Sequence, residues 1–173
     1  CVNALSEHLI VKVYRDAKVY QQEYKIGVPQ YPVKEVGNTD KRGTEVTFLP
    51  DKSIFSVTTY EYEVLCKRMR ELSFLNKGIS IKVIDKRTKD DDGEFLSESF
   101  YSEGGLSEFV KYIDSAREQL LSDVMYMEGE KNGIPVEIAL SYNTGFSETV
   151  HSYVNNINTH EGGTHLSGFR RAL

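Results

Sequence analysis

The sequence is poor in cysteine, lacks a long apolar run and has no excess of positive charge. Its two cysteines, Cys1 and Cys66, have the spacing of neither a metal site nor a disulfide framework, which favours a reducing cytosol. No apolar run approaches the ~20 residues that span a bilayer and no signal peptide is visible, so we expect a cytoplasmic protein without a membrane partner. The net charge of -5 argues against a general nucleic-acid-binding surface, although a local basic patch is still compatible with it.

The chain has 173 residues, enough for one domain or for parts of two. Both ends look cut. There is no initiator Met, the first six residues read as the tail of a helix, and residues 163–173 open a helix without a stop signal. We therefore expect an internal fragment of a larger protein.

The stretch 43–49 is the most informative strand signal. Alternation puts Thr44, Val46 and Phe48 on one face, so this apolar face begins with a hydroxyl. A hydroxyl that faces an interior costs about 1–3 kcal/mol unless something bonds it. Thr44 therefore bonds a neighbouring backbone group or water, or it faces a ligand, and the pattern alone leaves both interpretations open.

The rest of the chain reads as hairpins and helices in separate groups. Before residue 90 we expect a hairpin over 8–26, a short strand at 33–36 and a helix over 59–75 that starts with a capping box at Thr58 and Glu61. Strands on either side of a turn at 90–93 and a helix over 105–121 follow. The remaining elements are strands at 124–127, 134–142 and 148–155 and a helix from 163. Because helices do not alternate with single strands, the expected class is α+β, with a domain boundary near 121–123.

Two motif-like stretches have simpler interpretations. In 160–165 the second histidine of a zinc motif would stand where Thr164 lies, so no metal ligand is assigned. The stretch 90–93, three aspartates and a glycine, lacks the other ligands of a calcium loop and reads as a solvated turn.

Cys66 reads as a packed thiol within a helix. No nucleophilic triad, phosphate-binding glycine loop or carboxylate pair stands out.

Several blocks together resemble the bacterial DNA gyrase B family, the ATPase subunits of type IIA topoisomerases. They are Val-Asn-Ala-Leu-Ser at 2–6, Gly-Thr-Glu-Val-Thr-Phe at 43–48, Arg-Glu-Leu-Ser-Phe-Leu-Asn at 70–76, Asp-Lys-Arg at 85–87, and Tyr-Val-Asn-Asn-Ile at 153–157 with Gly-Gly-Thr-His-Leu-Ser-Gly-Phe-Arg at 162–170. One block would be weak evidence. Their common order over essentially the whole chain is specific.

The resemblance implies a fold and its division. Residues 1–121 would be the C-terminal part of a GHKL (Bergerat) ATPase domain, an α/β sandwich. Residues 122–173 would begin a transducer domain that resembles ribosomal protein S5 domain 2.

The resemblance also implies a function. The whole protein would be the ATP-hydrolysing subunit of a topoisomerase that negatively supercoils DNA by ATP-gated strand passage. It would use ATP and Mg²⁺, dimerise through its N-terminal region when ATP binds, and assemble with gyrase A and DNA as an A2B2 heterotetramer. The alternatives are the corresponding ATPase subunit of topoisomerase IV, which decatenates, and a dimerisation module that does not hydrolyse ATP.

Three residues match positions of the family's nucleotide pocket. Thr44 would contact the adenine edge through a shared water network, and Val46 would line the pocket floor. Arg15 would lie at the pocket rim, where the family contacts coumarin inhibitors, or it is an ordinary strand residue. The catalytic and Mg²⁺-binding residues precede Cys1 in the family order, and the groups that reach the γ-phosphate follow Leu173. We therefore assign no catalytic or metal residue and expect the fragment alone to be inactive.

Overall fold

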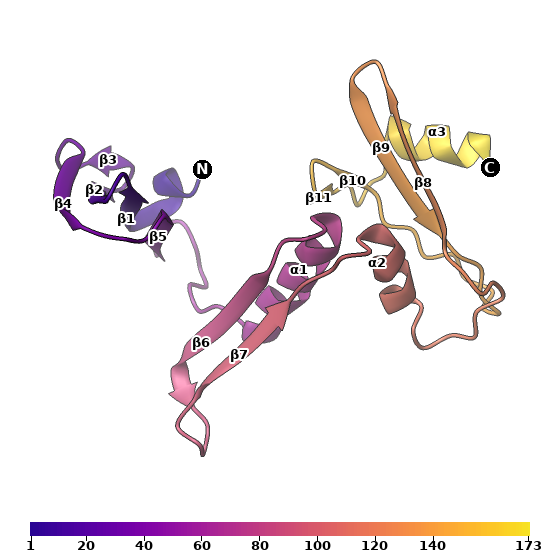
Figure 1. Ribbon diagram of the computed structural model, residues 1–173, viewed down its shortest axis with the longest axis horizontal. Helices are drawn as coiled ribbons and strands as arrows, with labels where there is room; N and C mark the ends of the chain where they lie inside the picture. The colour runs from indigo at the N-terminus through magenta and orange to yellow at the C-terminus, as the bar shows by residue number, and fades with distance from the viewer. The chain divides into compact units, whose positions relative to one another are not determined.

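The computed structural model describes residues 1–173, which form two compact units, 1–60 and 61–173. All strand pairs are antiparallel, and Figure 1 shows α1 along the β6–β7 hairpin, as expected for the α+β class. Unit 1 contains a 3₁₀ turn η1 (Asn3–Leu5), β1 (Ser6–Arg15), β2 (Lys18–Lys25), β3 (Val28–Pro29), β4 (Lys34–Asn38) and β5 (Gly43–Pro50). Unit 2 contains α1 (Tyr62–Leu75), β6 (Ile81–Lys89), β7 (Phe95–Phe100), α2 (Leu106–Ile113), β8 (Met125–Lys131), β9 (Ile134–Leu140), β10 (Tyr153–Val154), β11 (Ile157–Asn158) and α3 (Thr164–Ala172).

Unit 1 is one antiparallel sheet in which β1 lies between β2 and β5. The predicted hairpin 8–26 is confirmed. Asp16 and Ala17 form its two-residue turn with φ of 53° and 62°, the left-handed backbone that matches the twist of the flanking strands. The short strand predicted at 33–36 is present as β4, which pairs with β2.

The face of β5 that carries Thr44 is not an interior face in this unit. Leu9, opposite Phe48, is buried, but Phe48 is 44% exposed and Val46 is 53% exposed. Thr44 is exposed as well. The hydroxyl therefore does not face an interior in this unit, and a bond to water and a role toward a ligand both stay open. Water can satisfy the hydroxyl, so Thr44 needs no protein partner.

Helix α1 starts later than predicted. Glu61 occupies the N-cap position in extended backbone and no side chain caps the helix, so the capping box with Thr58 does not form. The predicted end is confirmed. Both the backbone N–H and the side-chain amide of Asn76 donate to the carbonyl of Leu72, and Gly78 follows with φ of 84°. Cys66 is a buried thiol in this helix, as expected.

The hairpin of β6 and β7 has the predicted turn at its tip. Asp90 Oδ1 accepts the backbone N–H groups of Asp92 at 3.1 Å and Glu94 at 2.8 Å. Gly93 adopts φ of 81°, which explains the glycine. The aspartate side chain thus bonds its own turn, and the interpretation of 90–93 as a solvated turn is confirmed.

Helix α2 ends at Ile113, well before the predicted end at 121. The predicted helix beyond Ile113 is wrong because Asp114 and the residues after it bond to the segment that follows β9. Leu120, which fits the apolar periodicity of a longer helix, is 62% exposed.

The β8–β9 hairpin is confirmed, with a two-residue turn at Asn132 and Gly133 whose φ values are 54° and 75°. The half-buried character predicted for 134–142 is confirmed only for the end of the strand, since Ile134 is 65% exposed while Ile138 and Leu140 are half-buried. The predicted strand 148–155 shrinks to β10. The predicted helix from 163 is α3.

Candidate functional site

The three residues predicted for the nucleotide pocket share one face of the unit 1 sheet. Thr44 lies directly opposite Val13 in the β1–β5 pairing, and Val46 lies opposite Val11. Arg15 is two residues beyond Val13 on β1 and therefore points to the same side. The structure thus puts the three positions next to one another on neighbouring strands, which their separation in sequence does not require.

The part of this face that β1 and β5 form is apolar and uncharged. Val11, Val13, Val46 and the methyl group of Thr44 form its surface, and the Thr44 hydroxyl is the polar group of this part. On β2, Gln22 and Tyr20 lie opposite Val11 and Val13 and add polar groups beside it. Arg15 lies at one end, with its Nε 3.2 Å from Asp16 Oδ2 and most of both side chains in water. An ion pair this exposed is weak, so the guanidinium can exchange Asp16 for another anion. Such a surface suits a flat, neutral ring with a hydrogen-bonding edge.

The opposite face of the same sheet has a different character. Tyr14 donates to Glu45 Oε2 at 2.9 Å, and this hydrogen bond raises the pKa of Tyr14. His8 Nε2 lies 2.7 Å from Glu23 Oε1, a hydrogen bond that lowers the pKa of Glu23 against the opposing effect of burial. These charged and hydroxyl groups already bond one another, so the Thr44 face is the better candidate for a ligand.

The residues present do not fit a metal ion. No three His, Cys, Asp or Glu side chains gather where they could hold one. No helix of the chain has the length and apolar character to cross a membrane.

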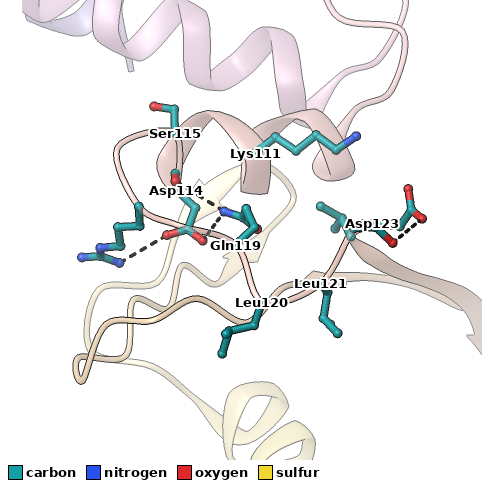
Figure 2. A pocket seen from close by; sticks show the side chains of 10 residues that line it. Lys111, Asp114, Ser115, Gln119, Leu120, Leu121 and Asp123 are labelled. Atoms are coloured by element: carbon teal, nitrogen blue, oxygen red, sulfur yellow. Dashed lines mark hydrogen bonds and ion pairs between the residues drawn. The ribbon is translucent and has the colours of Figure 1, made fainter.

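Unit 2 has a half-open cavity of about 440 Å³ at the end of α2. Figure 2 shows Lys111, Asp114 and Gln119 on one side and Leu120 and Leu121 on the other. The sequence does not predict this cavity, because the apolar periodicity continues the helix through these residues. The signal that was available is the pair Asp114 and Ser115, two residue types that compete with helical backbone hydrogen bonds.

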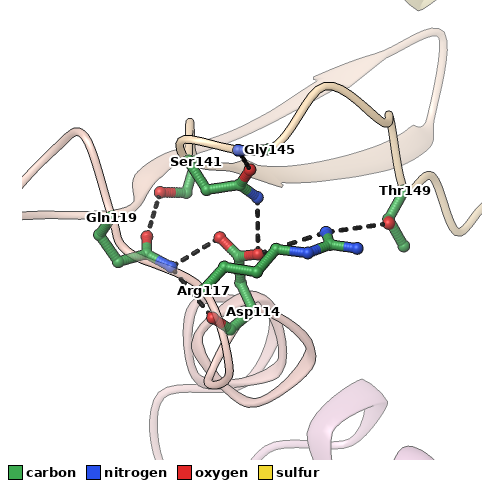
Figure 3. Close-up of polar contacts among 7 residues, drawn as sticks. Asp114, Arg117, Gln119, Ser141, Gly145 and Thr149 are labelled. Carbon is green, nitrogen blue, oxygen red and sulfur yellow. Dashed lines mark hydrogen bonds and ion pairs between the residues drawn. The ribbon is translucent and has the colours of Figure 1, made fainter.

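Asp114 is the centre of a polar cluster beside this cavity, and it is only 6% exposed. Its Oδ2 accepts a hydrogen bond from Gln119 Nε2 at 2.6 Å, and its Oδ1 accepts one from Asn143 Nδ2 at 2.6 Å (Figure 3). Arg117 Nη1 lies 3.5 Å from Oδ1. Ser141 donates to Gln119 Oε1 at 2.7 Å. The cluster thus ties the end of α2 to the turn after β9.

The Asp114 cluster is structural rather than a ligand site. A buried carboxylate is tolerated only when charge and hydrogen bonds compensate it, and here both oxygens have donors from the chain itself. The exposed sheet face of unit 1 therefore remains the best candidate for binding.

The comparisons with known proteins agree on one family. A family model described as DNA gyrase B matches residues 105–173. The chain is 60% identical over 173 residues to the DNA gyrase B protein of Cytophaga aurantiaca, a match that covers all of this chain and 36% of that protein. It is 47% identical to the DNA gyrase B protein of Halalkalibacterium halodurans over 99% of this chain and 26% of that one. The chain spans about a third of the length of the first of these relatives.

Solved structures give the same result for the fold. The 43K ATPase domain of Thermus thermophilus gyrase B, in complex with an aminocoumarin, matches with a TM-score of 0.78 and 30% identity over 98% of this chain and 45% of that one. The gyrase B protein of Myxococcus xanthus matches with a TM-score of 0.87 and 26% identity over 99% of this chain and 49% of that one. In sequence and in fold, this chain belongs to the DNA gyrase B family.

Proposed function

We propose that the complete protein is the ATP-hydrolysing subunit of a type II topoisomerase that negatively supercoils DNA by ATP-gated strand passage. The observation that carries the proposal is the 60% identity to a DNA gyrase B protein over every residue of this chain. The complete protein would use ATP with Mg²⁺ and work in the cytoplasm. It would act on DNA with gyrase A in an A2B2 assembly, and its N-terminal regions would dimerise when ATP binds.

The division into two domains is part of the same proposal. Residues 1–121 would belong to the GHKL ATPase domain and residues 122–173 to the transducer domain. The early end of α2 at Ile113 and the irregular segment that follows it support a boundary in this region. The proposed boundary lies within unit 2.

A supercoiling assay tests the proposed function. The complete protein, mixed with gyrase A, relaxed circular DNA and ATP, is expected to introduce negative supercoils. DNA that is decatenated but never supercoiled would favour the topoisomerase IV family instead. An assembly that dimerises without any ATP turnover would favour the module that does not hydrolyse ATP.

We propose that the Thr44 face of the sheet forms one wall of the adenine site. The Thr44 hydroxyl would bond the adenine edge through water, and Val46, beside Val11, would pack against the ring. Arg15 would lie at the rim, where its exposed guanidinium is available to a bound inhibitor. The contribution of this chain is then recognition and orientation of the base.

Replacing Thr44 with valine is expected to weaken nucleotide binding by the complete protein. Valine keeps the shape and strand preference of threonine and removes one hydrogen bond, which contributes about 0.5–1.5 kcal/mol, or roughly 2- to 12-fold in Kd. Isothermal titration with a non-hydrolysable ATP analogue measures the change.

Thr47→Val is the matched control, because Thr47 pairs with Ile10 on the opposite face of the same strand. It should leave the Kd unchanged. Equal affinities of the Thr44 variant and the unmodified protein would refute the assigned role of Thr44.

The 173 residues alone are proposed to hydrolyse no ATP. Phosphoryl transfer needs a base or a group that positions water, a bound Mg²⁺ and positively charged groups at the γ-phosphate, and the family resemblance assigns none of these to residues of this chain. Measurable turnover by the purified chain would contradict this expectation.

A further inference from the structure

The second half of α1 holds the turn between β10 and β11 through side chains far away in the sequence. Arg68 Nη2 donates to the carbonyl of Asn156 at 2.8 Å, and Asn156 Nδ2 donates to Asn76 Oδ1 at 2.8 Å. Glu71 accepts hydrogen bonds on its two oxygens, one from the Tyr153 hydroxyl and one from Arg68 Nη1. We call these five residues the α1 clamp.

The turn in the clamp has a backbone that few residues adopt. Asn155 and Asn156 close the two-residue β10–β11 loop with φ of 49° and 63°. Asparagine tolerates this left-handed conformation better than other residues with a side chain. The conformation presents both the carbonyl and the side-chain amide of Asn156 to α1. Asn76 is fully used too, since its Nδ2 caps α1 while its Oδ1 receives Asn156.

Glu71 is the charged centre of the clamp. Its side chain is only 19% exposed. Burial alone would raise the pKa of Glu71, but the hydrogen bonds from Tyr153 and Arg68 outweigh it and lower the pKa. The ionisable groups that face it are the guanidinium of Arg68 on its own helix and the imidazole of His151 from the segment before β10. The carboxylate thus stays ionised and keeps both donors.

Hydrogen bonds connect the β10–β11 turn to the start of α3. Thr159 N–H donates to the Ser152 carbonyl at 2.8 Å, which closes the base of the small hairpin. Gly162 N–H donates to the Thr159 carbonyl at 2.8 Å, and Thr159 Oγ1 lies 3.2 Å from His165 Nε2 in the first turn of α3. A continuous set of hydrogen bonds therefore connects the clamped turn to the start of this helix.

We propose that Arg68, Glu71 and Asn76 are positioning residues that fix the β10–β11 turn on α1 and so couple the ATPase part of the protein to the segment that carries α3. The inference rests on the proposed function, because α1 precedes the proposed domain boundary and the turn follows it. None of the clamp residues lies on the Thr44 face, so loss of the clamp should spare nucleotide binding. It should reduce the number of supercoils introduced per ATP hydrolysed.

Two variants open the clamp with small changes, and each has a matched control. Tyr153→Phe keeps the ring beside Phe109 and removes only the hydroxyl. Its control is Tyr126→Phe, which removes a hydroxyl that donates to Glu128 Oε2 within the same strand. Asn156→Ala removes the amide at φ of 63°, and Asn132→Ala imposes the same backbone strain at φ of 54° in the β8–β9 turn.

The experiment uses the complete protein with gyrase A and measures ATP turnover, supercoils per ATP, and hydrogen exchange. We expect the exchange of the Thr159 and Gly162 amides to rise roughly tenfold in both clamp variants, with supercoils per ATP lowered severalfold and the Kd for a non-hydrolysable ATP analogue unchanged. Both controls should match the unmodified protein.

Unchanged exchange in the clamp variants would overturn the clamp itself. Faster exchange with an unaltered number of supercoils per ATP would overturn the coupling and leave only a structural contact. If the unmodified protein does not supercoil DNA, the proposed function fails, while the exchange rates still decide whether the clamp fixes the turn.

Discussion

Replacing Phe109 with alanine is expected to destabilise unit 2 by about 3–5 kcal/mol, the usual cost of removing a buried phenylalanine ring. Phe109 is 8% exposed and lies on the buried side of α2. Its ring stacks on Phe74 of α1 with centroids 5.2 Å apart, and it also contacts the rings of His151 and Tyr153. One side chain thus joins α1, α2 and β10, and its removal leaves a cavity where all three meet.

The free energy of unfolding from urea denaturation, followed by circular dichroism, measures this loss. Phe146→Ala is the control, because Phe146 is fully exposed and its truncation should cost under about 0.5 kcal/mol. Similar losses for the two variants would mean that the Phe109 ring does not form the core of this unit.

Replacing Asp114 with alanine is expected to cost about 2–4 kcal/mol. The substitution removes the acceptor of the Gln119 and Asn143 amides; Gln119 is exposed, so water can replace part of its bond, while Asn143 is half-buried. A hydrogen bond to a charged group contributes about 1.5–3 kcal/mol, and the bond to the exposed Gln119 contributes less because water competes for it. Because the cluster connects α2 to the turn after β9, hydrogen exchange should rise first at Leu120 and Thr144, whose amides bond across this contact.

Asp123→Ala is the matched control for this prediction. Asp123 is exposed and accepts a hydrogen bond from its neighbour Ser122 at 3.1 Å, so its removal should change the free energy of unfolding by under about 0.5 kcal/mol. An Asp114 variant as stable as the Asp123 variant would show that the cluster contributes nothing to the fold.

The hairpins could be predicted from the sequence because their turns depend on local residues. Asp90 to Gly93 and Asn132 with Gly133 supply the backbone conformations that a tight turn requires, and the strands follow from alternation on either side. The end of α1 was predictable for the same reason, since Asn76 and Gly78 terminate it within one turn.

The end of α2 could not be predicted in this way. The apolar periodicity continues to Leu120, but Asp114 bonds Asn143, which lies 29 residues further along the chain. A single sequence does not show such a partner. The start of α1 is a second case, because the spacing of Thr58 and Glu61 permits a capping box and the extended backbone at Glu61 does not form it.

The candidate site was only partly accessible to reasoning from residues. Alternation alone put Thr44 and Val46 on one face of a strand, and the pairing of β1 with β5 adds Arg15 to that face. The exposure of this face could not be predicted, because the burial of a sheet face depends on what packs over it and not on the strand. The role in adenine binding comes from the family resemblance and stays a prediction.

A crystal structure of the complete protein with a non-hydrolysable ATP analogue tests the central claim most directly. We predict that the adenine ring lies against Val46, with the Thr44 hydroxyl bonded to its edge directly or through one water, while Thr47 on the other face of the strand makes no contact with the nucleotide. An adenine ring bound away from the Thr44 face would contradict the assignment of this sheet to the nucleotide site.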